Sequence, residues 1–338
     1  MRTTILTWLP TLAAGAALVL FGSRAVGAAE PGLDLRAVPH RIVYETFQDN
    51  NWELFICNAD GSNQTNLTRT PNVHELYPHV SPDGKLVSFL VDEGEGAKKT
   101  RNLYYMNMDG SGRTLVARNA RDQCWNGDGT ALAYLPGEFE EFTIKDYATK
   151  GLMIYDLATG KHRKHPNKDL HHLYNLCWAP DGKWFVATVH GGMGYNHAIL
   201  AIEADGQRVV NLKIPGCRPD LSHDGKKIAW GASDWTLRIA DFDTSGPEPK
   251  VTNARDVVSS AKPIEVYHID WSPDGKYVAF SRGPARKKLG PAPEMVGVTA
   301  EDWNICVADT TATNRWIELT KDGRSSKEPD WAPARKDK

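Results

Sequence analysis

A short turn motif recurs along this chain and constrains its fold more than any other feature. The motif ends in Asp-Gly, often with Pro before it and Lys after it, and its Asp falls at Asp83, Asp128, Asp181, Asp224 and Asp274. In such a turn Pro fixes φ, Asp bonds the local backbone, and Gly accepts a positive φ. The copies are 43 to 53 residues apart, which indicates a chain built from repeated units.

Each unit contains two turn signals with strand-like runs between them. Apolar runs such as Leu86–Leu90 and Tyr277–Phe280 follow the first turn, and their residue types are typical of strands. A further run and a second turn lie between copies, as in Leu103–Ser111, and a short final strand such as Thr65–Thr68 completes the unit. Four antiparallel strands in about 50 residues predict a propeller blade.

The two ends of the chain divide one unit between them. The repeats begin at Arg41–Tyr44, which is already a second strand, and end at Glu328–Pro333, which is only a first strand. Joining these segments predicts an all-β fold, a six-bladed β-propeller over residues 41–333 with four antiparallel strands per blade. The C-terminal strand would join the N-terminal blade and remove the open sheet edges that invite aggregation.

The first residues of the chain are of a different kind. Arg2 precedes an apolar run over residues 5–21, and small residues follow at Val26–Ala29, which is typical of a secretory signal peptide. We therefore expect a cleaved signal over residues 1–28, a short linker over 29–40, a C-terminal tail over 334–338, and a periplasmic or extracellular protein. An uncleaved membrane anchor formed by the same residues is the alternative. No later segment approaches the roughly 20 apolar residues that span a bilayer.

Charge, cysteine and tryptophan content narrow the possibilities. The 40 basic and 42 acidic residues give no basic surplus for binding nucleic acid. The five cysteines are an odd number and none form a Cys-x-x-Cys pair, so we expect buried free thiols. Four tryptophans share one repeat position, which predicts that their rings form a core between blades: Trp125, Trp178, Trp271 and Trp331.

The repeat resembles the TolB-type β-propeller repeat, also called PD40 or WD40-like. The resemblance rests on a recurring order of motifs: (W/V)SPDGK, a strand, LY, a strand, DGS and LT. It covers nearly all of residues 41–333. Repeats of this type occur in the periplasmic Tol–Pal component, in the propellers of prolyl-oligopeptidase-like peptidases and in oligogalacturonate lyases. The resemblance implies the propeller fold and, for function, either a partner-binding module or a lyase-like enzyme.

One repeat position predicts a binding site. The residue six positions before each turn Asp, and its equivalent in the last blade, should start the innermost strand at the mouth of the central channel. It is polar or amphipathic in every blade: Tyr77, Asp122, Asn175, Arg218, His268 and, in the last blade, Glu328. We call these residues the channel-mouth ring. They suit a small polar ligand, a peptide terminus, a carboxylate or an ion, although a water-filled funnel without a ligand, with Arg218 and Glu328 paired, is the alternative.

The loops on the same face vary in length, as binding loops on a rigid scaffold do. The insertions are expected at Asp92–Thr100, Pro136–Lys150, His190–His197 and Arg282–Asp302. One carries acidic side chains, Glu138, Glu140 and Glu141, and another carries basic ones, Arg282, Arg286, Lys287 and Lys288. Either loop could be a binding surface or simply a solvated loop.

Histidines gather in one blade and raise the possibility of a metal. Four are expected near the insertion face: His171, His172, His190 and His197. Imidazole suits divalent transition metals, but no pair has zincin spacing, and exposed or capping histidines are the alternative.

No catalytic motif is present, neither a Gly-x-Ser-x-Gly elbow nor a phosphate-binding loop. The leading hypothesis is therefore an exported binding or scaffold module for an envelope protein or peptide, with no cofactor expected, although a divalent metal ion is possible. The alternative is a metal-dependent, carbohydrate-active propeller, similar to oligogalacturonate lyase, in which His172, His197, Arg218 and His268 could serve.

Overall fold

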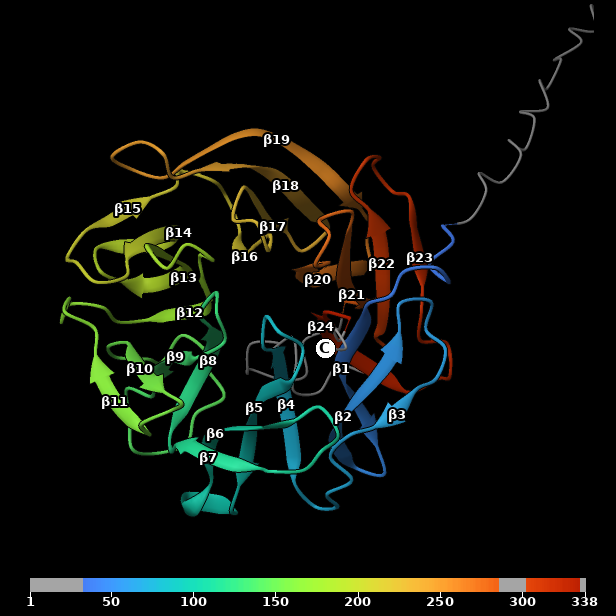
Figure 1. Cartoon of the computed structure of the whole chain (residues 1–338), viewed down its shortest axis with the longest axis horizontal. Helices are drawn as coiled ribbons and strands as arrows, with labels where there is room; N and C mark the ends of the chain where they lie inside the picture. Colours follow the sequence, from blue (N-terminus) through green and yellow to red (C-terminus); the bar gives the residue numbers. More distant parts are fainter. Residues whose placement is uncertain (1–32, 286–301, 335–338) are drawn as a thin grey trace, which may run out of the picture. The chain divides into compact units, whose positions relative to one another are not determined.

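Six four-stranded antiparallel sheets surround a central axis (Figure 1). The computed structural model describes residues 33–285 and 302–334, and the helical content of these residues is one 3₁₀ turn, η1 (Gly96–Lys98). The predicted six-bladed β-propeller is confirmed. The predicted signal peptide and the basic residues Arg286, Lys287 and Lys288 lie outside the described residues.

Five blades are made of consecutive strands, and each sheet keeps chain order across the blade. Blade 1 comprises β4 (His74–Val80), β5 (Leu86–Glu93), β6 (Thr100–Asn107) and β7 (Thr114–Ala117). Blade 2 comprises β8 (Ala120–Trp125), β9 (Ala131–Pro136), β10 (Met153–Asp156) and β11 (Lys161–Lys164). Blade 3 comprises β12 (Leu173–Trp178), β13 (Trp184–Gly192), β14 (Tyr195–Glu203) and β15 (Val209–Asn211).

The next two blades follow the same plan. Blade 4 comprises β16 (Cys217–Leu221), β17 (Lys227–Ser233), β18 (Thr236–Asp243) and β19 (Lys250–Ser259). Blade 5 comprises β20 (Ile264–Trp271), β21 (Tyr277–Pro284), β22 (Asn304–Asp309) and β23 (Trp316–Glu318).

Blade 6 is shared between the two ends of the chain. Its strands are β24 (Ser325–Ala332), β1 (Arg41–Gln48), β2 (Asn51–Asn58) and β3 (Thr65–Asn66), in that order across the sheet. Strand β24 pairs antiparallel with β1 from Arg41 opposite Ala332 to Phe47 opposite Ser325. The predicted closure by the C-terminal strand is therefore present.

The Asp-Gly turns have the conformation that their residues favour. In all five, an Asp side-chain oxygen accepts the backbone N–H two residues later at 3.0–3.2 Å, as Asp274 does from Lys276. The glycine between these residues has φ of 69° to 74° in every copy, a region that costs glycine little. These uniform turns form the face of the propeller opposite the insertions.

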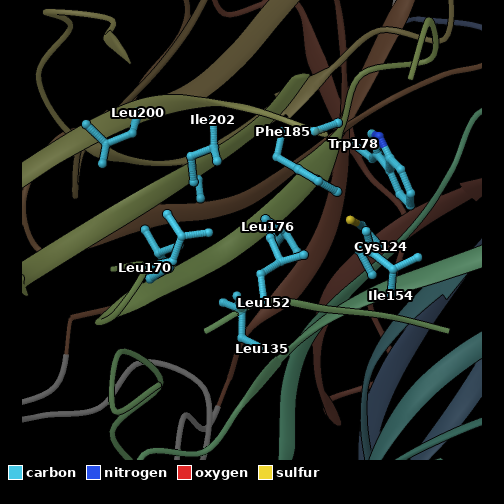
Figure 2. Packing of buried hydrophobic residues seen from close by; sticks show 14 of the residues in the cluster. Cys124, Leu135, Leu152, Ile154, Leu170, Leu176, Trp178, Phe185, Leu200 and Ile202 are labelled. Carbon is cyan, nitrogen blue, oxygen red and sulfur yellow. The ribbon is translucent and has the colours of Figure 1, made fainter. Parts of the chain in front are cut away.

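The repeated tryptophans pack in the core. Trp125, Trp178, Trp271 and Trp331 are 7, 9, 2 and 1% exposed, as predicted. Figure 2 shows Trp178 and Phe185 of blade 3 packing with Cys124 and Ile154 of blade 2 in one apolar cluster. Apolar side chains on facing sheets thus bury each other between neighbouring blades.

All five cysteines are unpaired, and Cys57, Cys124 and Cys306 are buried. The expected His190–His197 insertion is wrong in form, because β13 and β14 continue through it and His190 pairs in register with His197. Within the described part of the chain, no helix is long and apolar enough to cross a membrane.

Candidate functional site

A cavity of about 190 Å³ lies among the six innermost strands, β4, β8, β12, β16, β20 and β24. All six residues of the channel-mouth ring line it, together with residues closer to the Asp-Gly turns. The structure therefore brings together, from six blades, side chains that are up to 251 residues apart in the sequence.

Each ring residue lies on a β-bulge rather than at the start of its strand. In blade 1, for example, Leu76 faces Leu90 and His79 faces Ser88, so the inner strand holds one extra residue around Tyr77. Equivalent register shifts occur in all six blades, and every ring residue has a φ between 44° and 59°. Bulges re-aim side chains, and a left-handed backbone at a bulky residue is strained, so the scaffold must hold these positions.

The preceding blade anchors several of these bulges through its side chains. Asp122 Oδ1 accepts the backbone N–H of Asn175 at 2.8 Å, and Thr188 Oγ1 accepts that of Arg218 at 3.0 Å. Ser281 Oγ does the same for Glu328 at 3.1 Å. The ring is therefore positioned by contacts between blades and not by its own strands alone.

A second set of residues lines the cavity two positions further along each inner strand. These residues, which we call the latch ring, are His79, Cys124, Cys177, Asp220, Asp270 and Asp330. The three aspartates each accept a backbone N–H from the next blade, at Trp271, Trp331 and Val80, over 2.7–3.1 Å. Sequence reasoning missed this ring, although the same counting, four positions before each turn Asp, would have found it.

Burial controls the ionisation of the carboxyl groups in the cavity. Burial, reinforced by Asp146, raises the pKa of Asp122 to about 7. Burial also raises the pKa of Glu328 to about 7, against the opposing charges of Arg218 and Lys327. In the latch ring, burial and the nearby Asp330 raise the pKa of Asp220 to about 6. At neutral pH Asp122 and Glu328 are therefore only partly ionised.

His268 and Glu328 form a buried pair across neighbouring blades. His268 Nε2 lies 2.7 Å from Glu328 Oε1, and the histidine is 6% exposed. Burial and the charge of Arg218 hold the pKa of His268 well below its usual value, so its imidazole is neutral at pH 7. The alternative pairing of Arg218 with Glu328 is not what the structure shows.

One insertion reaches the channel mouth. Asp146, from the predicted Pro136–Lys150 insertion, lies 3.6 Å from the buried Arg101 guanidinium and 3.5 Å from the Tyr77 hydroxyl. The same segment exposes Phe139, which is 55% accessible. The insertion therefore borders the ring on the blade 1 and blade 2 side.

The four candidate metal histidines do not converge on one point. His171 and His172 direct their Nδ1 atoms at the backbone oxygens of Asp169 and Gly191, while His197 Nε2 contacts the Gly216 oxygen. None of the four lines the cavity. In the residues that the structure describes, no group of three or more His, Cys, Asp or Glu side chains could hold a metal ion. These histidines therefore do not fit the divalent metal that the lyase alternative requires.

Comparison with solved structures supports the fold. No family model and no curated protein matches the sequence. TolB from Acinetobacter baumannii has a TM-score of 0.64 at 18% identity, over 87% of this chain and 67% of that one. Hydrazine synthase from Kuenenia stuttgartiensis gives 0.59 at 11% identity, over 88% and 47%, and a nidogen/laminin complex gives 0.58 at 9%, over 88% and 99%.

This chain has a TolB-like propeller fold. The likeness to TolB covers 87% of this chain and agrees with the repeat pattern read from the sequence. At such low identities the similarity concerns the fold alone, and the function has to be argued from the residues in the channel.

Proposed function

We propose that this chain is an exported binding module that holds an envelope protein or peptide at the mouth of its channel. The observation that carries the proposal is the convergence of all six channel-mouth residues on one cavity. Concave sites with a few placed polar groups are where ligands usually bind. Export rests on the signal-like residues 1–28, and the TolB likeness agrees with an envelope role.

Buried polar atoms in the cavity support a ligand over a purely structural ring. Asn175 Oδ1 and Gln123 Oε1 are buried and have no hydrogen-bond partner in the described structure. A buried polar atom without a partner costs roughly 1–3 kcal/mol, which a polar ligand group would offset. The strained backbone at each ring residue agrees with a site whose geometry is maintained for binding.

The test is capture of a partner from an envelope extract by the mature protein, residues 29–338. We expect Asn175→Ala and Tyr77→Ala to reduce capture at least about tenfold, because they remove side chains at the channel mouth. Lys276→Ala is the matched control, since its exposed side chain lies on the opposite face and pairs with Asp274 in its own turn.

The opposite pattern would contradict the proposal. If Lys276→Ala abolished capture and the two ring variants left it intact, the binding site would lie on the opposite face of the propeller. Export is checked separately by intact mass, which should place the mature N-terminus at Ala29 or Glu30. A soluble protein that retained Arg2 would contradict the signal peptide.

A further inference from the structure

The cavity contains one guanidinium and five carboxyl groups, and each carboxyl group has a partner. Asp220, Asp270 and Asp330 accept backbone N–H groups from the next blade. Asp122 accepts the N–H of Asn175, and Glu328 lies beside His268. Each carboxyl group therefore has a direct contact other than the guanidinium, which belongs to Arg218, although the charge of Arg218 lowers the pKa of Glu328 against the effect of burial.

Among the charged groups that line the described cavity, Arg218 lacks a direct charged partner for its side chain. In the part of the chain that the structure describes, no carboxylate lies within 4.0 Å of its guanidinium, and its Nε is buried without a hydrogen-bond partner. Its backbone N–H is bound by Thr188, so the bulge is fixed. A buried donor nitrogen without a hydrogen-bond partner is costly, and natural proteins usually satisfy it.

The guanidinium is held in a defined orientation. It lies 4.8 Å from the centre of the Tyr267 ring, in blade 5, within cation–π range. The Tyr267 hydroxyl donates to Asp234 at 2.6 Å, which fixes the ring in turn. A planar guanidinium held on an aromatic face keeps its N–H fork available to a ligand and loses little further freedom on binding.

We infer that Arg218 receives the carboxylate of a ligand that enters the channel mouth. This inference rests on the proposed function, since it names the ligand group that the ring would hold. Carboxylates suit the site because the guanidinium fork matches their two oxygens and forms short, charge-assisted hydrogen bonds. The carboxylate could belong to a peptide, at its C-terminus or on an acidic side chain, or to a small organic acid.

The acidic character of the cavity does not exclude an anion. The aspartates of the latch ring lie two positions further along the strands, towards the opposite face, and are bonded to backbone N–H groups. Asp122 and Glu328 lie in the same ring as Arg218, but burial raises the pKa of each to about 7, so both are partly uncharged at neutral pH. Lowering the pH slightly below 7 should therefore favour the ligand carboxylate.

The test uses isothermal titration of the mature protein with three probes. These are N-acetyl-trialanine with a free carboxylate, the same peptide as its C-terminal amide, and succinate. We expect the free acid to bind at least about tenfold more tightly than the amide, because only the acid can form the charged fork. Arg218→Gln should remove that difference, and Arg218→Lys should restore only part of it, because Lys lacks the planar fork.

Arg163→Gln is the matched control variant. Arg163 lies on β11, the outer strand of blade 2, and pairs with Asp205 at the surface, so its loss should leave acid binding unchanged. Binding of succinate alone, still dependent on Arg218, would assign the site to small organic acids. Binding of the peptide acid alone would assign it to peptides.

Two results would overturn the inference. One is equal binding of acid and amide by the unaltered protein, which needs no variant to fold. The other is the absence of binding by any carboxylate probe up to roughly 10 mM, a weaker affinity than a specific site should show. If capture of an envelope partner depended on Asn175 and Tyr77 but not on Arg218, the proposed function would stand and only the carboxylate inference would fall.

Discussion

The latch-ring side chains that face the next blade differ in kind around the propeller. At the two interfaces of blade 6, Asp270 accepts the N–H of Trp331 at 2.7 Å, and Asp330 accepts that of Val80 at 2.8 Å. At the matching positions of blades 2 and 3 the side chains are the thiols of Cys124 and Cys177. Carboxylates are strong hydrogen-bond acceptors, whereas thiols are weak ones.

In blade 6 the innermost strand and the other three strands come from opposite ends of the chain. Strand β24 is joined to the N-terminal strands of blade 6 only by pairing with β1 and by side-chain contacts, including Lys327 Nζ at 2.8 Å from Glu45 Oε1. Asp330 also contacts His79 Nδ1 at 2.9 Å and raises the pKa of that histidine, although burial opposes the shift. Carboxyl contacts thus lie on both sides of the blade that closes the circle, and a third, from Asp220 to the Trp271 N–H, joins blades 4 and 5.

The largest effect should come from removing the closing strand. Deleting residues 325–338 leaves β1 with an open edge, removes Trp331 from the core and breaks both aspartate contacts of blade 6. We expect loss of cooperative unfolding or aggregation, because an exposed edge and an unsealed core arise together. Thermal unfolding followed by circular dichroism measures this, and a truncated protein that melts like the full chain would show that closure is unimportant.

A second pair of variants tests the two kinds of interface directly. Asp330→Ala leaves the Val80 N–H and His79 without their acceptor, and we expect a loss of about 2–3 kcal/mol in the free energy of unfolding. Cys124→Ala removes a thiol from the corresponding position in blade 2, and we expect a loss of about 1 kcal/mol. Urea denaturation of both variants decides the matter, since equal losses would remove the distinction between the interfaces.

Much of this architecture could be predicted from periodicity. The turns are local, because Asp and Gly encode them within a few residues, and counting from Asp83 or Asp274 places the buried tryptophans and the channel residues in phase. The same counting placed Tyr77 at the channel, but it gave the start of the strand where the structure has a bulge. A bulge is a mismatch between two paired strands, so one strand's sequence does not reveal it.

The sequence could not predict which side chains pair across the channel. Arg218, His268 and Glu328 were all placed at the mouth, but which of them meet depends on how each bulge aims its side chain. Likewise, His190–His197 reads as a loop because of its glycines, whereas cross-strand pairing extends both strands through it. Periodicity gives the position of a residue in the fold, and contacts between blades give its partner.

The third prediction tests the carboxyl group of Asp122 in blade 2, where the latch-ring residue is the thiol Cys124. At the interface of blades 2 and 3 the bonded carboxylate is Asp122, which accepts the Asn175 N–H from the channel-mouth ring rather than from the latch ring. Its pKa is raised to about 7 in the folded chain, from a usual value near 3.8, chiefly by burial. Asn at this position keeps an oxygen that can accept the same N–H but cannot ionise.

The sign of the effect follows from proton binding. Between pH 4 and pH 7 the folded protein holds a proton on Asp122 that the unfolded chain releases, so this group stabilises the fold at low pH and the stabilisation is lost as the pH rises towards 7. Relative to the unaltered protein, Asp122→Asn should therefore become more stable at pH 8 than at pH 5, by on the order of 2 kcal/mol. Urea denaturation of both proteins at the two pH values measures this difference. Histidines also titrate in this range, but both proteins contain them, so their contribution to the free energy of unfolding cancels in the comparison. A difference that does not change with pH would mean that Asp122 is already ionised at pH 5, and that the channel at blades 2 and 3 is more open to water than its burial indicates.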